Sequence, residues 1–209
     1  MYLYFDIDTT SLIPGQICRL AYIADEGNAV LAKNFFFSAD RVDPGCRRVH
    51  KLSVRRLETL SNGERFKDRA AEIAADFAAA DLVIAHNIRF DLAFLTKEFE
   101  RAKTPLVIKK RLCTMEYFTP LCRLSGNARN TYKYPKLAEL AAYFGIGEAE
   151  AAALAADVFG TQAAALCDAQ NDTLRNAVAE AETAHDARRD VALMYLCVKA
   201  ALKNGVVIE

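Results

Sequence analysis

The stretch YLYFDIDTT, residues 2–10, predicts the central strand of the fold and carries two carboxylates, Asp6 and Asp8, that suggest a metal site. Its apolar residues fall on both faces of the expected strand, which predicts a buried strand inside a sheet. Side chains two positions apart share one side of a strand, so Asp6 and Asp8 converge. Two carboxylates facing one point repel each other, and a bound Mg²⁺ or Mn²⁺ removes that conflict. The alternative is a solvated strand end that binds nothing.

The composition sets broad limits on the kind of protein. The chain has 209 residues, of which 53% are hydrophobic and 26% charged, so we expect one domain with a sizeable core. The net charge of zero means that the protein has no overall positive field to attract nucleic acid. An enzyme that binds only the end of a nucleic-acid chain does not need such a field. The six cysteines form no CxxC pair, no signal peptide precedes the first strand, and no apolar run approaches the roughly 20 residues of a membrane span. We expect a cytoplasmic protein with no membrane association.

The order of elements indicates the fold class. Two strands are expected after the first, joined by the turn-forming sequence DEGN, followed by a loop that contains Pro44 and Gly45. Strands and helices then alternate, which predicts an α/β fold with a mixed sheet: three antiparallel-type strands, then parallel strands, flanked by helices. The later elements are expected as helices at 64–80, 90–102, 135–146 and 187–203, a strand at 81–86, and a strand entering a helix at 110–118.

A second polar group lies in AHNIRFDLAFL, residues 85–95. Asn87 and Asp91 are four positions apart and share one face of a helix, with His86 and Phe90 on an adjacent face. A carboxylate that follows a strand closely, beyond its carboxyl end, is well placed for a site in an α/β protein. Taken alone, Asp91 is equally explained as a surface residue in a first helical turn, where the helix dipole favours an acid.

A third group lies in AHDARRDVALMYL, residues 184–196. His185 and Asp190 are five positions apart, which is poor alignment on a regular helix but works if His185 precedes the helix start. The apolar sequence behind Asp190 predicts a buried, rigid helix. A fixed carboxylate beside a more mobile imidazole suits a metal ligand and a proton acceptor, whereas the simpler alternative is a structural histidine.

Together, FDIDTTSL, AHNIRFDLAFL and AHDARRD resemble the motifs of the DEDDh branch of DnaQ-like 3′→5′ exonucleases. VHKLS and YPKLAELAAYFGI are further, softer matches, and the resemblance covers nearly the whole chain. It implies a ribonuclease H-like fold with a five-stranded mixed sheet, and a single exonuclease domain over residues 1–209. An extra helical segment at about 147–183 is longer than the family leads one to expect.

The resemblance also implies a mechanism. Asp6 would bridge two divalent ions, Mg²⁺ or Mn²⁺, with Asp8 and Asp190 as further ligands and Asp91 joining through a water. His185 would accept the proton of the attacking water, and nucleoside 5′-monophosphates would leave the 3′ end of single-stranded DNA or RNA. Residues implied to contact the terminal nucleotide are Thr9, Thr10, Leu12, His50, His86, Asn87 and Phe90. Segment 147–183 is open to several interpretations: a lid, the surface for a homodimer or a polymerase partner, or an extra pair of surface helices.

Two departures from the family pattern leave other functions open. Asp8 stands where the family usually has Glu, and Ser11 where it has Gly. The missing methylene withdraws the carboxylate by ~1.5 Å, a misplacement that costs on the order of 10²-fold in rate unless the site compensates. One alternative is a noncatalytic nucleic-acid-binding or polymerase-associated module with the same fold. The other is a haloacid dehalogenase-type phosphatase with Asp6 as nucleophile and Asp8 as general acid, which leaves the two later motifs unexplained.

Overall fold

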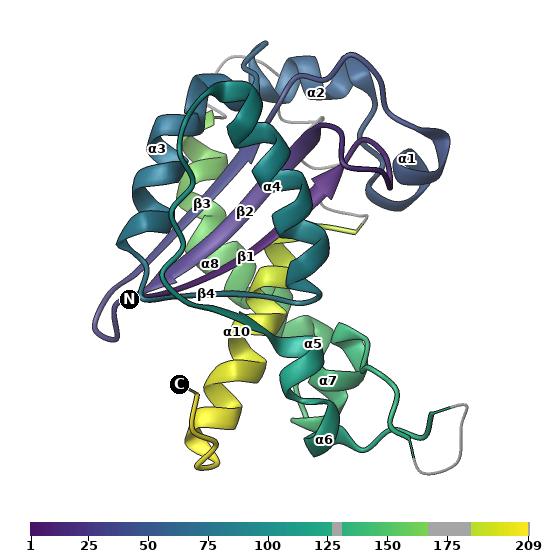
Figure 1. Cartoon of the computed structure of the whole chain (residues 1–209), viewed down its shortest axis with the longest axis vertical. Coiled ribbons are helices and arrows are strands. Elements are labelled where there is room, and N and C mark those ends of the chain that lie inside the picture. Colours follow the sequence, from purple (N-terminus) through teal and green to yellow (C-terminus); the bar gives the residue numbers. More distant parts are fainter. Residues whose placement is uncertain (127–130, 167–184, 209) are drawn as a thin grey trace.

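A five-stranded mixed sheet forms the centre of the computed structural model, which describes residues 1–126, 131–166 and 185–208 (Figure 1). The strand order is β3-β2-β1-β4-β5. β1 pairs antiparallel with β2, and β2 antiparallel with β3, whereas β1 with β4 and β4 with β5 are parallel. The predicted mixed sheet, antiparallel first and then parallel, is therefore confirmed. The strands are β1 (Tyr2–Thr9), β2 (Ile17–Asp25), β3 (Val30–Phe36), β4 (Leu82–Ala85) and β5 (Arg111–Cys113).

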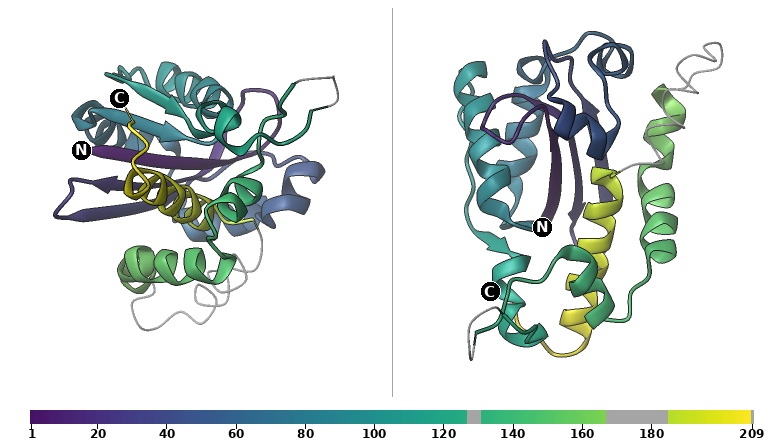
Figure 2. Two further views of the ribbon diagram at one scale, coloured as in Figure 1. Left: turned by 90° about the horizontal axis from the view of Figure 1, so that it is seen from below. Right: turned by 90° about the vertical axis from the view of Figure 1, so that its right-hand side faces the viewer.

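Helices cover both faces of the sheet, as Figure 2 shows. α3 (Phe66–Ala79) and α4 (Ile88–Ala102) lie on one face, and α10 (Ala187–Lys203) lies on the other. α8 (Glu148–Leu166) packs against α10 and β3, and its buried residues join the same hydrophobic cluster as those of α10. The final helix has the predicted bounds. Of the predicted extra segment at 147–183, the structure describes α8, and residues 167–183 lie outside the described part of the chain.

The alternation of β1 determines which way its acids face. Leu3 and Phe5 belong to the hydrophobic cluster beneath α3 and α4, whereas Tyr4 belongs to the cluster beneath α10. Because the side-chain period of a strand is two residues, Asp6 and Asp8 lie on the side of Tyr4, toward α10. The strand is thus buried on both faces, as predicted, and directs its two carboxylates to one side.

A short helix lies within the loop predicted at residues 39–53, and a second short helix follows it. α1 (Pro44–His50) begins with this proline in its first turn, where the missing N–H would have no helical partner. α2 (Val54–Ser61) is capped by Ser53, whose hydroxyl accepts a hydrogen bond from the backbone N–H of Arg56 at 3.2 Å. The loop prediction was wrong because the proline and glycine here mark a helix start rather than an irregular stretch. Short helices carry too few residues for a clear apolar period.

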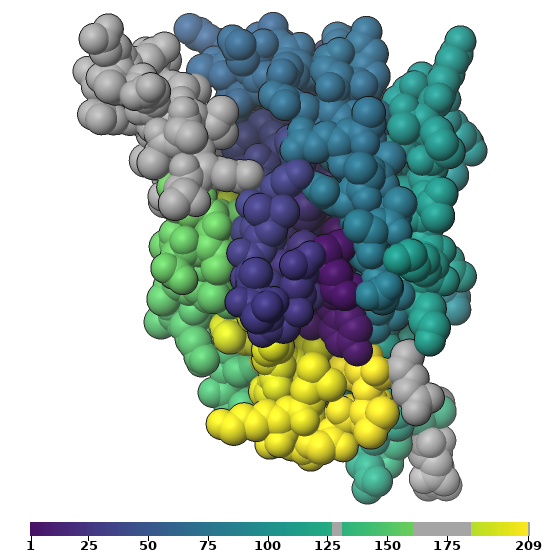
Figure 3. All heavy atoms as spheres, turned by 90° about the vertical axis from the view of Figure 1, so that its left-hand side faces the viewer, coloured from purple at the N-terminus to yellow at the C-terminus, as the bar shows by residue number. Residues whose placement is uncertain are grey.

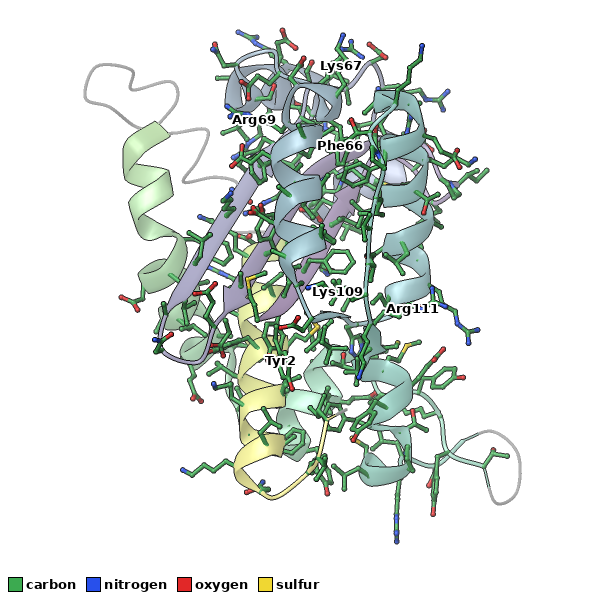
Figure 4. All side chains as sticks on the ribbon, turned by 60° about the vertical axis from the view of Figure 1, so that its left-hand side comes forward. Tyr2, Phe66, Lys67, Arg69, Lys109 and Arg111 are labelled. Carbon is green, nitrogen blue, oxygen red and sulfur yellow. The ribbon has the colours of Figure 1, made fainter. Side chains whose placement is uncertain are left out.

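α3 and α4 pack against each other through aromatic side chains. Phe66 is buried between them with its ring 5.0 Å from that of Phe99, while Lys67 points to solvent (Figure 4). Figure 3 shows the turn between β2 and β3 at the surface, between α8 and α3. Three shorter helices complete the described part: α5 (Thr114–Tyr117), α6 (Thr119–Cys122) and α7 (Leu137–Tyr143).

Two further expectations concern thiols and membranes. The cysteines within the described residues are all free thiols, and all but Cys122 are buried; they are Cys18, Cys46, Cys113, Cys122 and Cys197. No helix in the described ranges combines the length and the apolar character that crossing a bilayer requires.

Candidate functional site

Three elements bring the predicted acids to the carboxyl end of β1. Asp91 lies in the first turn of α4, which follows β4 through a sharp turn in which Asn87 adopts a left-handed conformation, with φ of 70°. Asp190 lies in the first turn of α10, whose N-cap is Asp186. Because β1 and β4 are parallel, the helix after β4 begins at the same edge of the sheet as the end of β1. The acids of all three motifs therefore meet around Asp6.

The electrostatics of the site confirm that these acids interact. Burial raises the pKa of Asp6 well above its usual range, and the nearby carboxylates, Asp190 foremost and then Asp91 and Asp8, raise it further. Burial also raises the pKa of Asp91. Burial and neighbouring acids raise the pKa of Asp190 to about 6, against the opposing effect of His185. The site thus concentrates negative charge in a poorly solvated place.

Each of these aspartates also has an oxygen that lacks a hydrogen bond, although for Asp8 and Asp190 this oxygen faces a basic group, Arg19 at 3.9 Å and His185 at 3.1 Å. One buried carboxylate oxygen of Asp6, Asp8, Asp91 and Asp190 makes no hydrogen bond. Orphaned, buried, like-charged oxygens are costly, and a hard divalent cation satisfies them. As the side chains stand, however, no three His, Cys, Asp or Glu groups in the described residues form a set that could hold a metal ion. The donor chemistry fits Mg²⁺ or Mn²⁺, and the carboxylates have to draw together around such an ion.

His185 lies between two of the acids, just before α10. Its Nδ1 is 3.1 Å from Asp190 Oδ2 and 3.8 Å from Asp8 Oδ1. The interaction with Asp8, reinforced by that with Asp190, outweighs burial and raises the pKa of His185 to about 9. The imidazole is therefore a cation at neutral pH and offsets part of the negative charge of the two carboxylates. With 51% of its side chain exposed, it is free to turn toward solvent.

A buried network of charged side chains around Arg19 lies behind the acids and was not predicted from the sequence. Arg19 on β2 pairs across the sheet with Asp8, and its guanidinium lies 3.9 Å from Asp8 Oδ2 and 2.5 Å from Asp186 Oδ1. Its Nε donates to Asn34 at 2.8 Å, and its side chain is almost wholly inaccessible. Arg19 thereby ties the end of β1 to the N-cap of α10. A single cation inside the apolar run QICRLAYIA is the signal that marks it in the sequence.

A cleft of about 660 Å³ opens beside the acids. Asp8 and His185 belong to its lining, and apolar side chains form much of the rest. Leu12 and Ile13 project from the loop after β1 with 79% and 78% of their surface exposed. The complete lining is Ile7, Asp8, Thr9, Ser11, Leu12, Ile13, Asp43, Gly45, Cys46, Val49, His50 and His185. An open, apolar hollow with a few polar groups at one end is typical of a small-molecule or terminal-nucleotide site.

Three of the residues predicted to contact substrate line this cleft: Thr9, Leu12 and His50. The ring of His50 is fixed because its Nδ1 accepts from the backbone N–H of Leu52 at 3.0 Å. Its Nε2 then donates to the carbonyl of Thr9 at 3.2 Å, which anchors α1 to the end of β1. Burial lowers the pKa of His50, so it serves as a neutral, structural part of the wall.

The other predicted contacts do not line the cleft. The hydroxyl of Thr10 donates to the carbonyl of Gln16 within the loop after β1. His86 has both ring nitrogens engaged, since Nε2 donates to the carbonyl of Pro135 at 3.1 Å and Nδ1 lies 3.0 Å from the Thr114 hydroxyl. Phe90 packs against Phe94 at a ring distance of 4.9 Å, and Asn87 is exposed at the start of α4. Local spacing could not reveal the partners of His86, because they come from distant parts of the chain.

The chain matches no protein-family model and no curated protein.

Proposed function

We propose that this chain is a metal-dependent 3′→5′ exonuclease that releases nucleoside 5′-monophosphates from single-stranded DNA or RNA, with the ribonuclease H-like architecture of DEDDh-type, DnaQ-like enzymes. The observation that carries the proposal is the meeting of Asp6, Asp8, Asp91 and Asp190 at the end of β1, each with a buried oxygen that makes no hydrogen bond. These acids come from three separate motifs, and His185 lies against two of them. A phosphatase with Asp6 as nucleophile leaves Asp91, Asp190 and His185 without a role.

The chain's own residues would divide the chemistry among them. Asp6, Asp8 and Asp190 would hold two divalent ions, with Asp91 at the edge of the set. When bound, such ions neutralise the phosphodiester and stabilise the entering and leaving oxygens of an in-line displacement. His185 would leave its ion pair with the carboxylates once these hold the ions, and would lose to solvent the proton that the pair stabilises. As a neutral imidazole it would then take a proton from the attacking water. The water oxygen then bonds to phosphorus, and the bond from phosphorus to the 3′ oxygen of the preceding nucleotide breaks.

The cleft would position the terminal nucleotide for this reaction. Leu12, Ile13 and Val49 offer apolar surface to a base or sugar, and Asp8 and His185 lie at the adjoining wall. The Arg19–Asp186 pair would keep Asp8 and the start of α10 in fixed relation, which offsets part of the reach that Asp8 loses relative to Glu. This arrangement favours the hydrolysis of one terminal phosphodiester at a time.

A noncatalytic nucleic-acid-binding module is the second candidate function, and one observation favours it. Asp8 is held between Arg19 and His185, at 3.9 Å and 3.8 Å, and no set of donors among the described residues is already arranged for a metal ion. If the carboxylates keep these cationic partners in solution, the site binds no metal and cuts nothing. The exonuclease experiment separates the two functions.

That experiment incubates the full chain with 5′-labelled single-stranded DNA and RNA in Mg²⁺, in Mn²⁺ and in EDTA. The proposal predicts a ladder shortened from the 3′ end and release of 5′-monophosphates, in metal only. Asp190→Asn should abolish the release and His185→Ala should reduce it by at least about 10²-fold, while circular dichroism shows intact folding. Metal-independent binding without any release by wild type would instead support the noncatalytic module.

A further inference from the structure

The surface of α1 and α2 carries cations that the rest of the described chain does not neutralise. The acids in the same region have other partners: Asp43 pairs with Arg41 at 2.9 Å, and Glu58 accepts a hydrogen bond from Ser38. We name the four cations together the basic surface. They are Arg47, Arg48, Lys51 and Arg55, all exposed and all without an ion pair to any described residue.

Many basic residues elsewhere on the molecule are paired, and those without an ion pair to a described residue, such as Lys67, Lys103 and Lys203, are scattered along the chain. Lys33 pairs with Glu72 and Asp76, and Arg69 binds Glu64 through two hydrogen bonds. Further pairs join Arg65 to Asp40, Lys97 to Glu100, Lys109 to Asp81, Lys133 to Glu139 and Lys199 to Asp25. In a chain of zero net charge, the basic surface is thus a local concentration of free positive charge.

The basic surface adjoins the cleft. α1 contributes Gly45, Cys46, Val49 and His50 to the cleft lining. On a helix, residues three apart are neighbours, so Arg48 lies beside Gly45, and Arg47 beside His50. Figure 1 shows α1 and α2 beyond the carboxyl end of β1, the end where the acids gather. A single-stranded nucleic acid that leaves the cleft over α1 would therefore meet these arginines first.

We infer that the basic surface binds the phosphate backbone of a single-stranded nucleic acid whose 3′ end lies in the cleft. This rests on the proposed function and adds its substrate class: strands of several nucleotides, in preference to dinucleotides. Each nucleotide behind the terminal one brings one phosphate, and arginine binds phosphate through two parallel hydrogen bonds. A dinucleotide has no phosphate left for the basic surface once its only linkage lies at the acids.

The test measures binding in EDTA, where no metal-dependent cleavage occurs, by fluorescence anisotropy of labelled thymidine dinucleotide and 12-mer. The test variant is Arg47→Glu/Arg48→Glu. The control is Lys110→Glu/Arg111→Glu, an equal charge change at exposed residues beside β5. Arg111 pairs in register with Val83, at the end of the sheet opposite the acids, and Figure 4 shows it far from α2. Thermal unfolding of both variants checks that they fold.

The inference predicts that wild type binds the 12-mer at least about tenfold more tightly than the dinucleotide. The test variant should lose that advantage, and the slope of log K against log salt should fall by about 1.4, or about 0.7 for each lost phosphate contact. The control variant should bind as wild type does. Equal binding of the 12-mer by test variant and wild type would overturn the inference, as would equally effective competition by polyglutamate, which would make an acidic protein the ligand.

Failure of this inference can be distinguished from failure of the exonuclease proposal. If wild type releases no mononucleotides but the basic surface binds the 12-mer, the exonuclease proposal fails and the inference stands. If wild type cleaves and the test variant shows an unchanged KM for the 12-mer, the exonuclease proposal stands and the inference fails. A raised KM for the 12-mer at unchanged kcat, with the dinucleotide unaffected, supports both.

Discussion

Arg19 is the residue whose environment is most demanding. A guanidinium removed from water is stable only if it is paired, and Arg19 meets Asp186, Asn34 and Asp8. The ring of Phe36 lies 4.9 Å from the guanidinium carbon and adds a cation–π contact. This cluster joins β1, β2, β3 and the start of α10, so the candidate site depends on it without Arg19 reaching the cleft lining.

We predict that Arg19→Met lowers the free energy of unfolding by about 3 kcal/mol, because it leaves Asp186 buried with a reduced set of partners. Urea titration followed by circular dichroism gives the value. Lys97→Met is the matched control, since it breaks an exposed ion pair with Glu100 and should shift the midpoint little. A similar small effect for both substitutions would show that the buried pair does not hold the sheet to α10.

Asp6 should destabilise the folded protein in the absence of metal. Its carboxylate is buried among three other acids and has an orphaned oxygen. Asp6→Asn removes that repulsion, so the metal-free variant should melt at the same temperature as wild type or a few degrees higher, about 2–4 °C for each kcal/mol. Differential scanning fluorimetry in EDTA tests this, with Asp157→Asn on the exposed side of α8 as control.

The same pair of variants reports metal binding without any activity assay. Mn²⁺ at about a hundredfold excess over its Kd should stabilise wild type and Asp157→Asn by about 2.7 kcal/mol. Asp6→Asn should lose most of that stabilisation. An undiminished rise in melting temperature for Asp6→Asn would place the metal elsewhere.

Among the elements, α10 is held at its start and again along its second half. Asp186 and Arg19 hold its start. Further along, Asp25 at the end of β2 accepts hydrogen bonds from Lys199 Nζ at 3.0 Å, the Tyr195 hydroxyl at 3.2 Å and the Gly27 N–H at 2.6 Å. Burial alone would raise the pKa of Asp25, but these donors outweigh it and lower the pKa below its usual value.

A pH dependence follows from that shift. A carboxyl whose folded-state pKa is lowered contributes stability above its unfolded pKa of about 3.9, and the contribution is lost as the pH falls through the folded pKa. Wild type should therefore exceed Asp25→Asn in unfolding free energy by a constant amount between about pH 5 and 7. That difference should shrink as the pH drops below about 4. Urea titrations across this range measure it, and a difference that grows on acidification would contradict the assignment.

α8 should contribute to the core and not simply cover the surface. Phe159 is 1% exposed and belongs to the cluster beneath α10. We expect Phe159→Ala to cost about 3–5 kcal/mol in unfolding free energy through the cavity it leaves. Asp157→Ala, on the exposed side of the same helix, should be nearly neutral in the same urea titration. If both substitutions were neutral, α8 would be an appendage that the sheet does not need.

Across the whole molecule, the sequence predicted those elements whose apolar pattern is long or whose turn residues lie within one stretch of chain. β1, the hairpin of β2 and β3, and α10 follow from apolar runs and turn residues within single stretches of chain. The rule that parallel strands present their carboxyl ends at one edge placed Asp91 beside Asp6, whereas the family resemblance placed Asp190 with them. α1 and α2 were missed because a helix of seven or eight residues shows too little periodicity.

Long-range partners were beyond the reach of sequence reasoning. The pairing of Arg19 with Asp186 needs the register of β2 on β1 and the docking of α10 together. His86 was assigned to substrate by the family resemblance, but Thr114 and Pro135 hold its ring. The cleft likewise depends on His50 anchoring α1 to Thr9 across 41 positions, a contact with no local signature.

The central claim is that these carboxylates form a two-ion centre at the end of β1. Its most direct test is the anomalous scattering of Mn²⁺ in crystals grown with the metal. The account predicts two peaks about 3.5–4 Å apart, bound by Asp6 and by oxygens of Asp8 and Asp190. Well-diffracting crystals at saturating Mn²⁺ with no peak at these side chains, and His185 still between Asp8 and Asp190, would contradict it.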